Sequence, residues 1–358
     1  MDLSGLFDLV RNVYADYAFS KKSGTVKMPL RYILELTYRC NLHCPFCYIT
    51  GERAIEELNT KEWLDIIGQI PPFSLISFVA GEVLLKEDFE IIYKTACKNF
   101  RKVSLITNGL ILNENLINLF VKNKLLLLSV SLDAIGEKHD KIRNHKGLYD
   151  KVISNLMLFD EKRCRNKSPM LDIKTCVLEN NLDDIVPLYK KAIELKSQFF
   201  SLTFIRKQPL RQNSMLFNEF SREFYTDEYP VNPYFDLEHF KEVYKELESI
   251  SKNTKTILRY APRFNPRGDI DKIEKFFKSG NTPVKNLYER CRIPMTSVYI
   301  TPSGDIYPCL SYKIANLKEM KLKDAINIPK FKCFRKNLYH AQIFNACQMC
   351  CDAVPKNL

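Results

Sequence analysis

The sequence predicts an α/β protein built on a parallel sheet. Between residues 31 and 206, apolar runs of strand length alternate with amphipathic segments of helical length. The strand candidates are nearly continuous apolar runs, as is typical of parallel strands covered on both faces. A chain of 358 residues is long enough for one large domain and a smaller one.

The elements follow this alternation in order. The chain begins with an amphipathic helix candidate at 1–19 that carries acidic residues and lacks the basic start of a signal peptide. Six strand candidates follow, at 31–36, 74–82, 102–109, 125–134, 171–179 and 199–206. Each strand but the last precedes a helix candidate, at 60–70, 86–100, 113–123, 147–162 and 181–196. Ligand sites are expected at the carboxyl ends of such strands, whether the sheet is open or curved.

The alternation stops after residue 206. A helix candidate at 236–251 and the Pro-, Arg- and Asn-rich stretch 260–269 indicate a connection. Residues 296–309 predict a hairpin with Pro-Ser-Gly-Asp at its centre. The sequence therefore predicts four parts, which are an N-terminal helical extension, a core, a connecting region and a C-terminal domain at 1–30, 31–210, 211–290 and 291–358.

The net charge of +12 is large, but lysine and arginine are spread along the chain. This distribution favours a solvated surface over a nucleic-acid interface, and no nucleic-acid-binding motif is present. No apolar stretch approaches the length of a membrane span. We therefore expect a cytoplasmic protein with neither a nucleic-acid nor a membrane partner.

The twelve cysteines indicate metal binding, because cysteine clusters in a reducing compartment seldom form disulfides. One compact group comprises Cys40, Cys44 and Cys47. A sparser group comprises Cys291, Cys309, Cys347 and Cys350, with Cys351 directly after it. The remaining cysteines are predicted to be small buried hydrophobic residues, namely Cys97, Cys164, Cys176 and Cys333.

The first group lies in the loop after the first strand, with the spacing C-x3-C-x2-C. Zinc prefers four closed ligands, and His43 is the available fourth donor. However, the side chains of His43 and Cys44 diverge because the residues are neighbours. A four-iron four-sulfur cluster held by three thiolates instead keeps one iron open for a substrate or cofactor.

These residues resemble the radical S-adenosylmethionine (radical SAM) enzymes, whose motif is C-x3-C-x-aromatic-C after the first strand of a partial six-stranded (β/α) barrel. Four further segments resemble strand-end motifs of that family, namely AGEV (80–83), TNG (107–109), SLDA (131–134) and HDKIRNHKG (139–147). Ala80, Val83 and Ala134 depart from the family pattern. The resemblance implies SAM contacts at Phe46, Gly81, Glu82, Asn108, Ser131, Asp133 and Arg143.

The resemblance also implies the chemistry. A reduced four-iron four-sulfur cluster donates an electron to SAM, which yields methionine and a 5′-deoxyadenosyl radical that removes a hydrogen atom from the substrate. Such an enzyme needs an external electron donor such as flavodoxin or ferredoxin.

The second cysteine group resembles the Twitch domain, a shortened form of the SPASM domain that holds one auxiliary four-iron four-sulfur cluster. The matching features are Gly304 five residues before Cys309 and the CxxC pair Cys347–Cys350. Cys351 is an alternative ligand to Cys350. A structural zinc held by the same four thiolates is a second interpretation of this group.

Together these features predict a radical SAM oxidoreductase that dehydrogenates or crosslinks a peptide or a small polar molecule, with the auxiliary cluster as electron acceptor. The alternative is a non-catalytic iron–sulfur or zinc protein, such as a sensor or an assembly factor. The SAM contacts favour the enzyme, because a sensor does not need them. The sequence indicates neither the substrate nor a general base.

Overall fold

A computed structural model of the chain describes residues 3–47, 49, 55–163, 168–205, 235–264, 270–279, 282–309 and 312–356, with side chains from residue 9 onward. These residues form one ten-stranded sheet with the order β10-β9-β8-β1-β2-β3-β4-β5-β6-β7. Residues 206–210 at the end of the expected core, residues 211–234, 265–269 and 280–281 of the expected connecting region, and Cys164 lie outside the described residues.

All six predicted strands are present, and they pair in parallel in chain order. They are β1 (Arg31–Glu35), β2 (Leu75–Val79), β3 (Lys102–Thr107), β4 (Leu127–Ser131), β5 (Met170–Val177) and β6 (Phe199–Phe204). The predicted α/β class and parallel sheet are therefore confirmed. A seventh parallel strand, β7 (Ile257–Ala261), extends the sheet beyond β6 and was not predicted.

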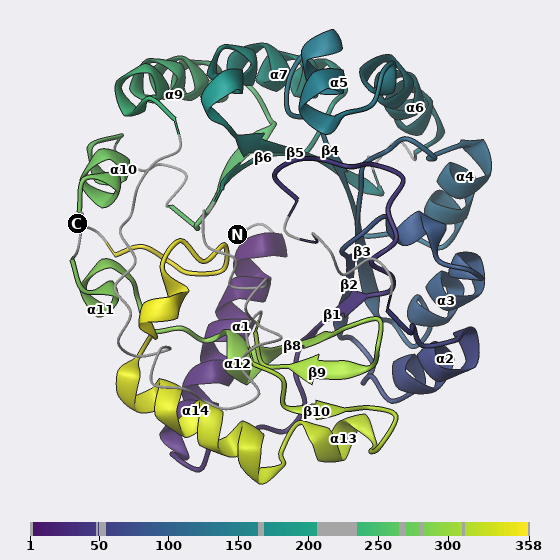
Figure 1. The fold of residues 1–358 in the computed structure, drawn as a ribbon, viewed down its shortest axis with the longest axis vertical. Helices are drawn as coiled ribbons and strands as arrows, with labels where there is room; N and C mark the ends of the chain where they lie inside the picture. The colour runs from purple at the N-terminus through teal and green to yellow at the C-terminus, as the bar shows by residue number, and fades with distance from the viewer. Residues whose placement is uncertain are drawn as a thin grey trace.

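Helices connect the strands and lie along the outside of the curved sheet (Figure 1). They are α2 (Thr60–Gly68), α3 (Phe89–Ala96), α4 (Glu114–Lys122), α5 (Glu137–Arg143), α6 (Leu148–Lys162), α7 (Leu182–Glu194) and α9 (Leu237–Ser251). Side chains cap several of them. At α2, the Asn59 side chain accepts from the Glu62 N–H and the Glu62 side chain accepts from the Asn59 N–H, a reciprocal capping box.

The C-terminal part continues the same sheet on the other side of β1. Strand β8 (Ser297–Ile300) pairs in parallel with β1, and β9 (Asp305–Tyr307) returns antiparallel to β8, which confirms the predicted hairpin. The short β10 (Ala315–Asn316) completes this edge. The remaining helices of this part are α10 (Ile270–Phe277), α11 (Val284–Leu287), α12 (Ile293–Thr296), α13 (Leu322–Ala325) and α14 (Pro329–Ala341).

The predicted N-terminal helix is α1 (Leu3–Ser20). Its last turns pack Ala15, Ala18 and Phe19 against Met295 of α12, in a small core of their own. This contact joins the N-terminal helix to the C-terminal part.

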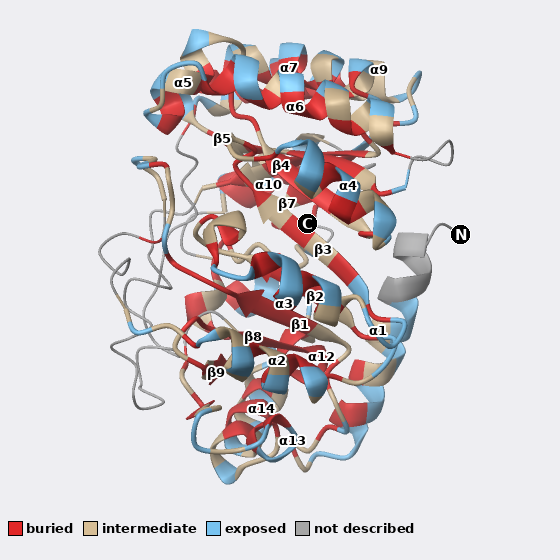
Figure 2. Ribbon diagram, turned by 90° about the vertical axis from the view of Figure 1, so that its right-hand side faces the viewer, coloured by how far each residue is buried: buried red, intermediate tan, exposed pale blue. Residues whose placement is uncertain are grey.

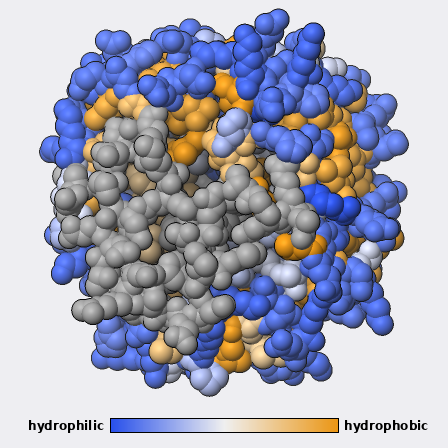
Figure 3. Space-filling view, viewed as in Figure 1, coloured by the Kyte–Doolittle hydropathy of each residue, from blue (hydrophilic) through white to orange (hydrophobic). Residues whose placement is uncertain are grey.

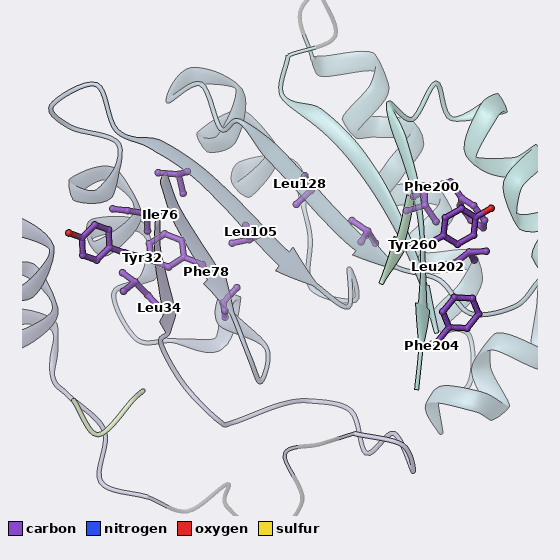
Figure 4. Packing of buried hydrophobic residues seen from close by; sticks show 14 of the residues in the cluster. Tyr32, Leu34, Ile76, Phe78, Leu105, Leu128, Phe200, Leu202, Phe204 and Tyr260 are labelled. Carbon is purple, nitrogen blue, oxygen red and sulfur yellow. The ribbon is translucent and has the colours of Figure 1, made fainter. Parts of the chain in front are cut away.

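The main core lies between the outer face of the sheet and the helices. Alternate residues along each strand point into it, as Phe78, Leu105 and Phe204 do in Figure 4. Phe78 contacts Phe89 of α3, and Phe204 contacts Phe240 of α9. Each fully buried apolar side chain of this kind contributes roughly 1.5–3 kcal/mol. Figure 2 shows the sheet as largely buried and the outward faces of the helices as exposed.

The inner face of the sheet differs from the outer face. On β5, β6 and β7 the residues that face the helices are buried. Lys174, Thr203 and Arg259 alternate with them along the strands, face the other side of the sheet and are only half-buried. Packing therefore fills the helix side of these strands and leaves the other side partly accessible.

Hydrophilic residues predominate around the rim of the face shown in Figure 3. None of the helices in the described part of the chain is long and apolar enough to span a membrane.

Candidate cofactor and cluster sites

The three cysteines of the first group lie in one tight loop after β1. Cys40, Cys44 and Cys47 are half-buried, and the Cys47 N–H donates to the Cys44 carbonyl at 3.1 Å. Two backbone N–H groups point at sulfur, from Leu42 to Cys40 and from Ile49 to Cys47, both at 3.4 Å. Hydrogen bonds of this kind favour the thiolate, the form that binds metal.

The loop fits an iron–sulfur cluster better than a single metal ion. Within the described ranges, no group of three or more His, Cys, Asp or Glu side chains is arranged to hold a metal ion. The ligands of one zinc ion must all converge on it, whereas the thiolates of a cluster bind different irons. His43, the fourth donor of the zinc alternative, is exposed. The donor set therefore fits three irons of a four-iron cluster.

The end of β2 holds the cysteine loop in place. The Glu82 N–H donates to the Arg39 carbonyl at 2.8 Å. Gly81 before it has φ +51°, and a Cβ atom there would lie 2.5 Å from the Thr37 carbonyl oxygen. Only glycine allows this approach. Ala80 also has a positive φ of 72°, so this departure from the family pattern keeps the sharp turn at some conformational cost.

The carboxylate of Glu82 is fully buried at the same edge of the sheet. It accepts hydrogen bonds from the Leu84 N–H, the Thr107 hydroxyl and the Asn108 N–H. Burial raises the pKa of Glu82 to about 7, although these hydrogen bonds oppose the rise. All of its hydrogen-bond donors among the described residues are uncharged, and a buried carboxylate of this kind suits a ligand that brings an ammonium group.

Asn108 connects the end of β3 to the cysteine loop. Its side-chain amide donates to Asn41 Oδ1 at 2.8 Å and to the Cys40 sulfur at 3.9 Å. Its own Oδ1 accepts the Leu110 N–H at 2.9 Å. The predicted TNG segment therefore lies against the cysteines, as the resemblance implies.

Asp133 and Arg143 form a buried ion pair near the same loop. Arg143 Nε donates to Asp133 Oδ2 at 2.7 Å, and the Cys176 N–H donates to Asp133 Oδ1 at 2.8 Å. The guanidinium of Arg143 lies 5.6 Å from the centre of the Phe46 ring. The Cys44 thiol donates to the Arg143 carbonyl at 3.9 Å. Both oxygens of Asp133 are thus bonded within the chain, one of them to Arg143.

Ser131, the remaining candidate SAM contact, ends β4 on the inner face and is half-buried. It is the register partner of Lys174 on β5. The structure therefore brings all seven predicted cofactor residues to the ends of β1–β4 or to the segments that follow them.

The second cysteine group lies beside the C-terminal extension of the sheet. Cys291 precedes α12, Cys309 follows β9, and the Cys350 N–H donates to the Cys347 carbonyl at 3.0 Å. Burial raises the pKa of Cys291 to about 12, and the nearby Cys309 adds to the rise. A bound metal would reverse this effect, because metal ligation deprotonates thiols.

The residue after Cys351 connects this group to the inner face of the sheet. Asp352 accepts a hydrogen bond from the Tyr299 hydroxyl at 3.0 Å and lies 4.0 Å from the Arg31 guanidinium. Tyr299 of β8 packs with Ile33 of β1 and Tyr307 of β9. The second group is therefore attached to the strand that precedes the first cysteine loop.

Several supporting residues escaped the sequence analysis. Thr107, Asn41 and Cys176 bond to predicted site residues, and Asp352 supports the second group. The one available signal was position, because Thr107, Asn41 and Asp352 each lie directly beside a predicted SAM contact or a candidate cluster ligand. Cys176 lies inside the predicted strand 171–179 and gave no such signal.

Two family matches agree with this geometry. Residues 34–192 match the radical SAM superfamily, and residues 291–351 match SPASM, an iron–sulfur cluster-binding domain. Together these ranges cover more than half of the chain. The chain belongs to the radical SAM superfamily and carries a C-terminal SPASM-type domain. Its cofactors are SAM, the four-iron four-sulfur cluster of the first domain and an auxiliary iron–sulfur cluster in the second. This membership disfavours the non-catalytic alternative.

The chain is also similar to curated proteins. It is 24% identical over 188 residues to the antilisterial bacteriocin subtilosin biosynthesis protein AlbA of Bacillus subtilis, a match of 51% of this chain and 41% of that protein. It is 28% identical over 143 residues to the PqqA peptide cyclase of Granulibacter bethesdensis, 38% of each chain. The matches thus span about two fifths of the length of these relatives.

Two solved structures share the fold. SuiB of Streptococcus suis bound to S-adenosylmethionine has a TM-score of 0.63 at 17% identity, with 92% of this chain and 73% of that chain covered. Native anSMEcpe with bound AdoMet and Kp18Cys peptide has a TM-score of 0.60 at 17% identity, with 91% of this chain and 89% of that chain covered. These likenesses confirm the fold.

SAM affinity is expected to fall as the pH falls below about 7, by about tenfold per pH unit in the acid range. On the prediction that Glu82 contacts SAM, only its ionised form would attract the SAM ammonium group, and burial raises the pKa of Glu82 to about 7. The measurement is SAM titration of the anaerobic holoenzyme from about pH 5.5 to about 7.5.

Glu82→Gln is the matched variant for this titration. It keeps the shape of the side chain and should bind SAM weakly and with little pH dependence. An equally steep profile in Glu82→Gln would assign the pH dependence to another group. The stability of the fold depends on pH in the opposite direction. Because the pKa of Glu82 is higher in the folded than in the unfolded state, folding takes up a proton, and the free energy of unfolding decreases as pH rises from about 4 to about 7.

Proposed function

We propose that this chain removes a hydrogen atom from a peptide and completes a net two-electron oxidation, either a dehydrogenation or a crosslink, with the auxiliary cluster as electron acceptor. The observation that carries the proposal is the placement of the two cysteine groups. The first follows β1, and the second is attached through Tyr299 and Asp352 to β8, the direct neighbour of β1. The inner face of one sheet thus lies between them.

A peptide is the substrate class that the relatives favour. One relative is named as a cyclase of the PqqA peptide, and SuiB has been crystallised with its precursor peptide SuiA. The inner face of the sheet supports the same class, because its half-buried side chains, among them Lys174 and Thr203, can contact an extended segment that lies along the strands.

The residues of this chain have separate tasks in such a reaction. When bound, the cluster and SAM supply the 5′-deoxyadenosyl radical that takes the hydrogen atom. Cys40, Cys44 and Cys47 would hold the cluster, and Glu82 would hold the amino group of SAM. Arg143, fixed by Asp133, keeps its positive charge beside the cysteine loop. An external electron donor would reduce the cluster.

Cys309→Ala tests the auxiliary cluster. We expect the iron content to fall from about eight to about four atoms per chain, while 5′-deoxyadenosine is still formed. The peptide should no longer lose two hydrogen atoms, because the substrate radical lacks its electron acceptor. The assay uses anaerobically reconstituted enzyme, a mixture of capped peptides randomised at each position, and mass spectrometry.

Cys333→Ala is the control, because Cys333 is exposed on α14. It should retain both the iron and the peptide product. Wild-type enzyme that cleaves SAM but never removes hydrogen from any peptide of the mixture would contradict the proposed oxidation. A Cys309→Ala variant with unchanged peptide oxidation would contradict the role of the auxiliary cluster.

A further inference from the structure

One carboxylate holds the turn that leads into the first cysteine loop. Glu57 Oε1 accepts hydrogen bonds from the Thr37 hydroxyl and from the Tyr38 N–H, the latter at 3.3 Å. Glu57 Oε2 lies 3.7 Å from the Arg39 guanidinium. These partners are consecutive in the sequence and directly precede Cys40, the first thiol of the loop. A single side chain therefore contacts the last three residues before Cys40.

The end of β2 fixes the same turn through its carbonyl groups. A Cβ atom at Gly81 would lie 2.5 Å from the Thr37 carbonyl oxygen and 2.6 Å from the Arg39 carbonyl oxygen. The Arg39 carbonyl also accepts the Glu82 N–H at 2.8 Å. The carbonyl groups of the turn thus lie against the end of β2, while its hydroxyl and N–H groups bond to Glu57.

A buried lysine forms an ion pair with Glu57. Lys86 Nζ donates to Glu57 Oε2 at 3.0 Å and to the Leu58 carbonyl at 2.8 Å. The Lys86 side chain is only 6% exposed and the Glu57 side chain 12%, so solvent screens this ion pair weakly. Lys86 follows the short helix η1 (Val83–Leu85), which begins directly after Glu82. The ion pair therefore connects the turn to the segment that follows Glu82.

The C-terminal hairpin anchors the segment that carries Glu57. The Leu58 N–H donates to the Pro302 carbonyl at 2.7 Å, and the Leu58 side chain is buried. A Cβ atom at Gly304 would lie 3.2 Å from Leu58 Cδ2, so the hairpin turn packs directly on this leucine. Glu57 is thus held, through the residue next to it, by the hairpin that leads to Cys309.

We propose that Glu57 is a positioning residue for the first cluster, because it fixes the turn that places Cys40. The Cys40 sulfur accepts the Leu42 N–H at 3.4 Å and the Asn108 side-chain amide at 3.9 Å, and both contacts depend on where the turn places it. Lys86 compensates the buried charge of Glu57, while the hydrogen bonds that Glu57 accepts hold the turn. This inference rests on the assignment of the first cysteine group to a cluster, which is part of the proposed function.

The test compares two double variants that both lack the ion pair. Glu57→Gln/Lys86→Met keeps an acceptor oxygen for the turn, whereas Glu57→Leu/Lys86→Met has a side chain of similar size without one. Neither variant leaves a buried unpaired charge, so the difference between them reports the hydrogen bonds to the turn. Glu56→Gln is the surface control, because the Glu56 side chain is 87% exposed in its ion pair with Lys318.

The measurement is the rate at which a ferrous-iron chelator removes each cluster from reduced, anaerobically reconstituted protein. Electron paramagnetic resonance follows the clusters separately, because only the cluster with an open iron should change its signal when SAM is added. The SAM-responsive cluster should be lost about fivefold faster from Glu57→Leu/Lys86→Met than from Glu57→Gln/Lys86→Met, the effect of about one hydrogen bond on an equilibrium constant. The auxiliary cluster should be lost at the same rate from both variants, and Glu56→Gln should match the wild-type protein.

Equal rates of loss of the SAM-responsive cluster from the two double variants would overturn the inference, since the acceptor oxygen would then have no effect. Equally accelerated loss of both clusters from Glu57→Leu/Lys86→Met would assign Glu57 a general structural role and would also overturn it. Failure of the proposed peptide oxidation is distinguishable from both results, because the assay contains no peptide. A wild-type protein without a SAM-responsive signal would overturn the assignment of the first cysteine group, and this inference with it.

Discussion

Cys44→Ala is expected to abolish reductive cleavage of SAM. Cys44 is the central thiol of the first cysteine group, and its loss leaves two thiolates for a cluster that needs three. The anaerobically reconstituted variant should contain about four iron atoms in place of about eight, all in the auxiliary site. It should form no 5′-deoxyadenosine above the background of the reductant, as measured by chromatography and mass spectrometry.

Cys97→Ala provides the matched control. Cys97 is a partly buried thiol that packs against the main core, at the C-terminal cap of α3 and remote in sequence from both cysteine groups. The control should keep its full iron content and its cleavage of SAM. A Cys44→Ala protein that still cleaves SAM would show that the cluster has other ligands, and the assignment of the first group would fail.

The strands were predictable because their helix-facing residues are constrained. Apolar runs of five to eight residues mark β1–β6, since their outer residues must pack against helices. Strand β7 escaped prediction because ILRYA carries Arg259 on its inner face and is followed by Pro262. Helix α5 escaped because EKHDKIR is mostly charged and shows no apolar stripe. Helix α3 begins later than expected, because Asp88 before it adopts a left-handed conformation.

The positions of the candidate cofactor residues were predictable because they follow strand ends in a fixed order. The residues that form hydrogen bonds and ion pairs with them were not predictable. The pairing of Asp133 with Arg143 depends on how α5 folds back, and no spacing rule specifies it. Asp172 and Lys174 did leave a signal, because they occupy alternate positions in LDIKTCV. Charge at every second residue of a parallel strand indicates that one face of that strand is not covered by helices.

Asp133→Ala is expected to destabilise the protein by about 3–5 kcal/mol, because it leaves the Arg143 charge buried and unpaired. Asp133 is fully buried, and the side chain of Arg143 is only 10% exposed. His139 cannot offset the lost carboxylate. Its Nδ1 accepts the Asp133 N–H, and burial lowers the pKa of His139 to about 4, so that its ring is neutral. The measurement is the urea midpoint of anaerobic protein, with Glu246→Ala in an exposed ion pair as the control.

The double variant Asp133→Ala/Arg143→Met separates the charge effect from loss of packing. Because no unpaired charge is left, the double variant should be more stable than Asp133→Ala alone. If the two substitutions acted independently, their destabilisations would instead add, and the double variant would be the less stable one. Glu246→Ala should shift stability by less than about 1 kcal/mol. The Cys44 thiol donates to the Arg143 carbonyl, so both Asp133 variants should also incorporate less iron in the first cluster. If the double variant is less stable than Asp133→Ala, the two side chains stabilise the protein by packing. The destabilisation of Asp133→Ala would then not come from an unpaired charge on Arg143.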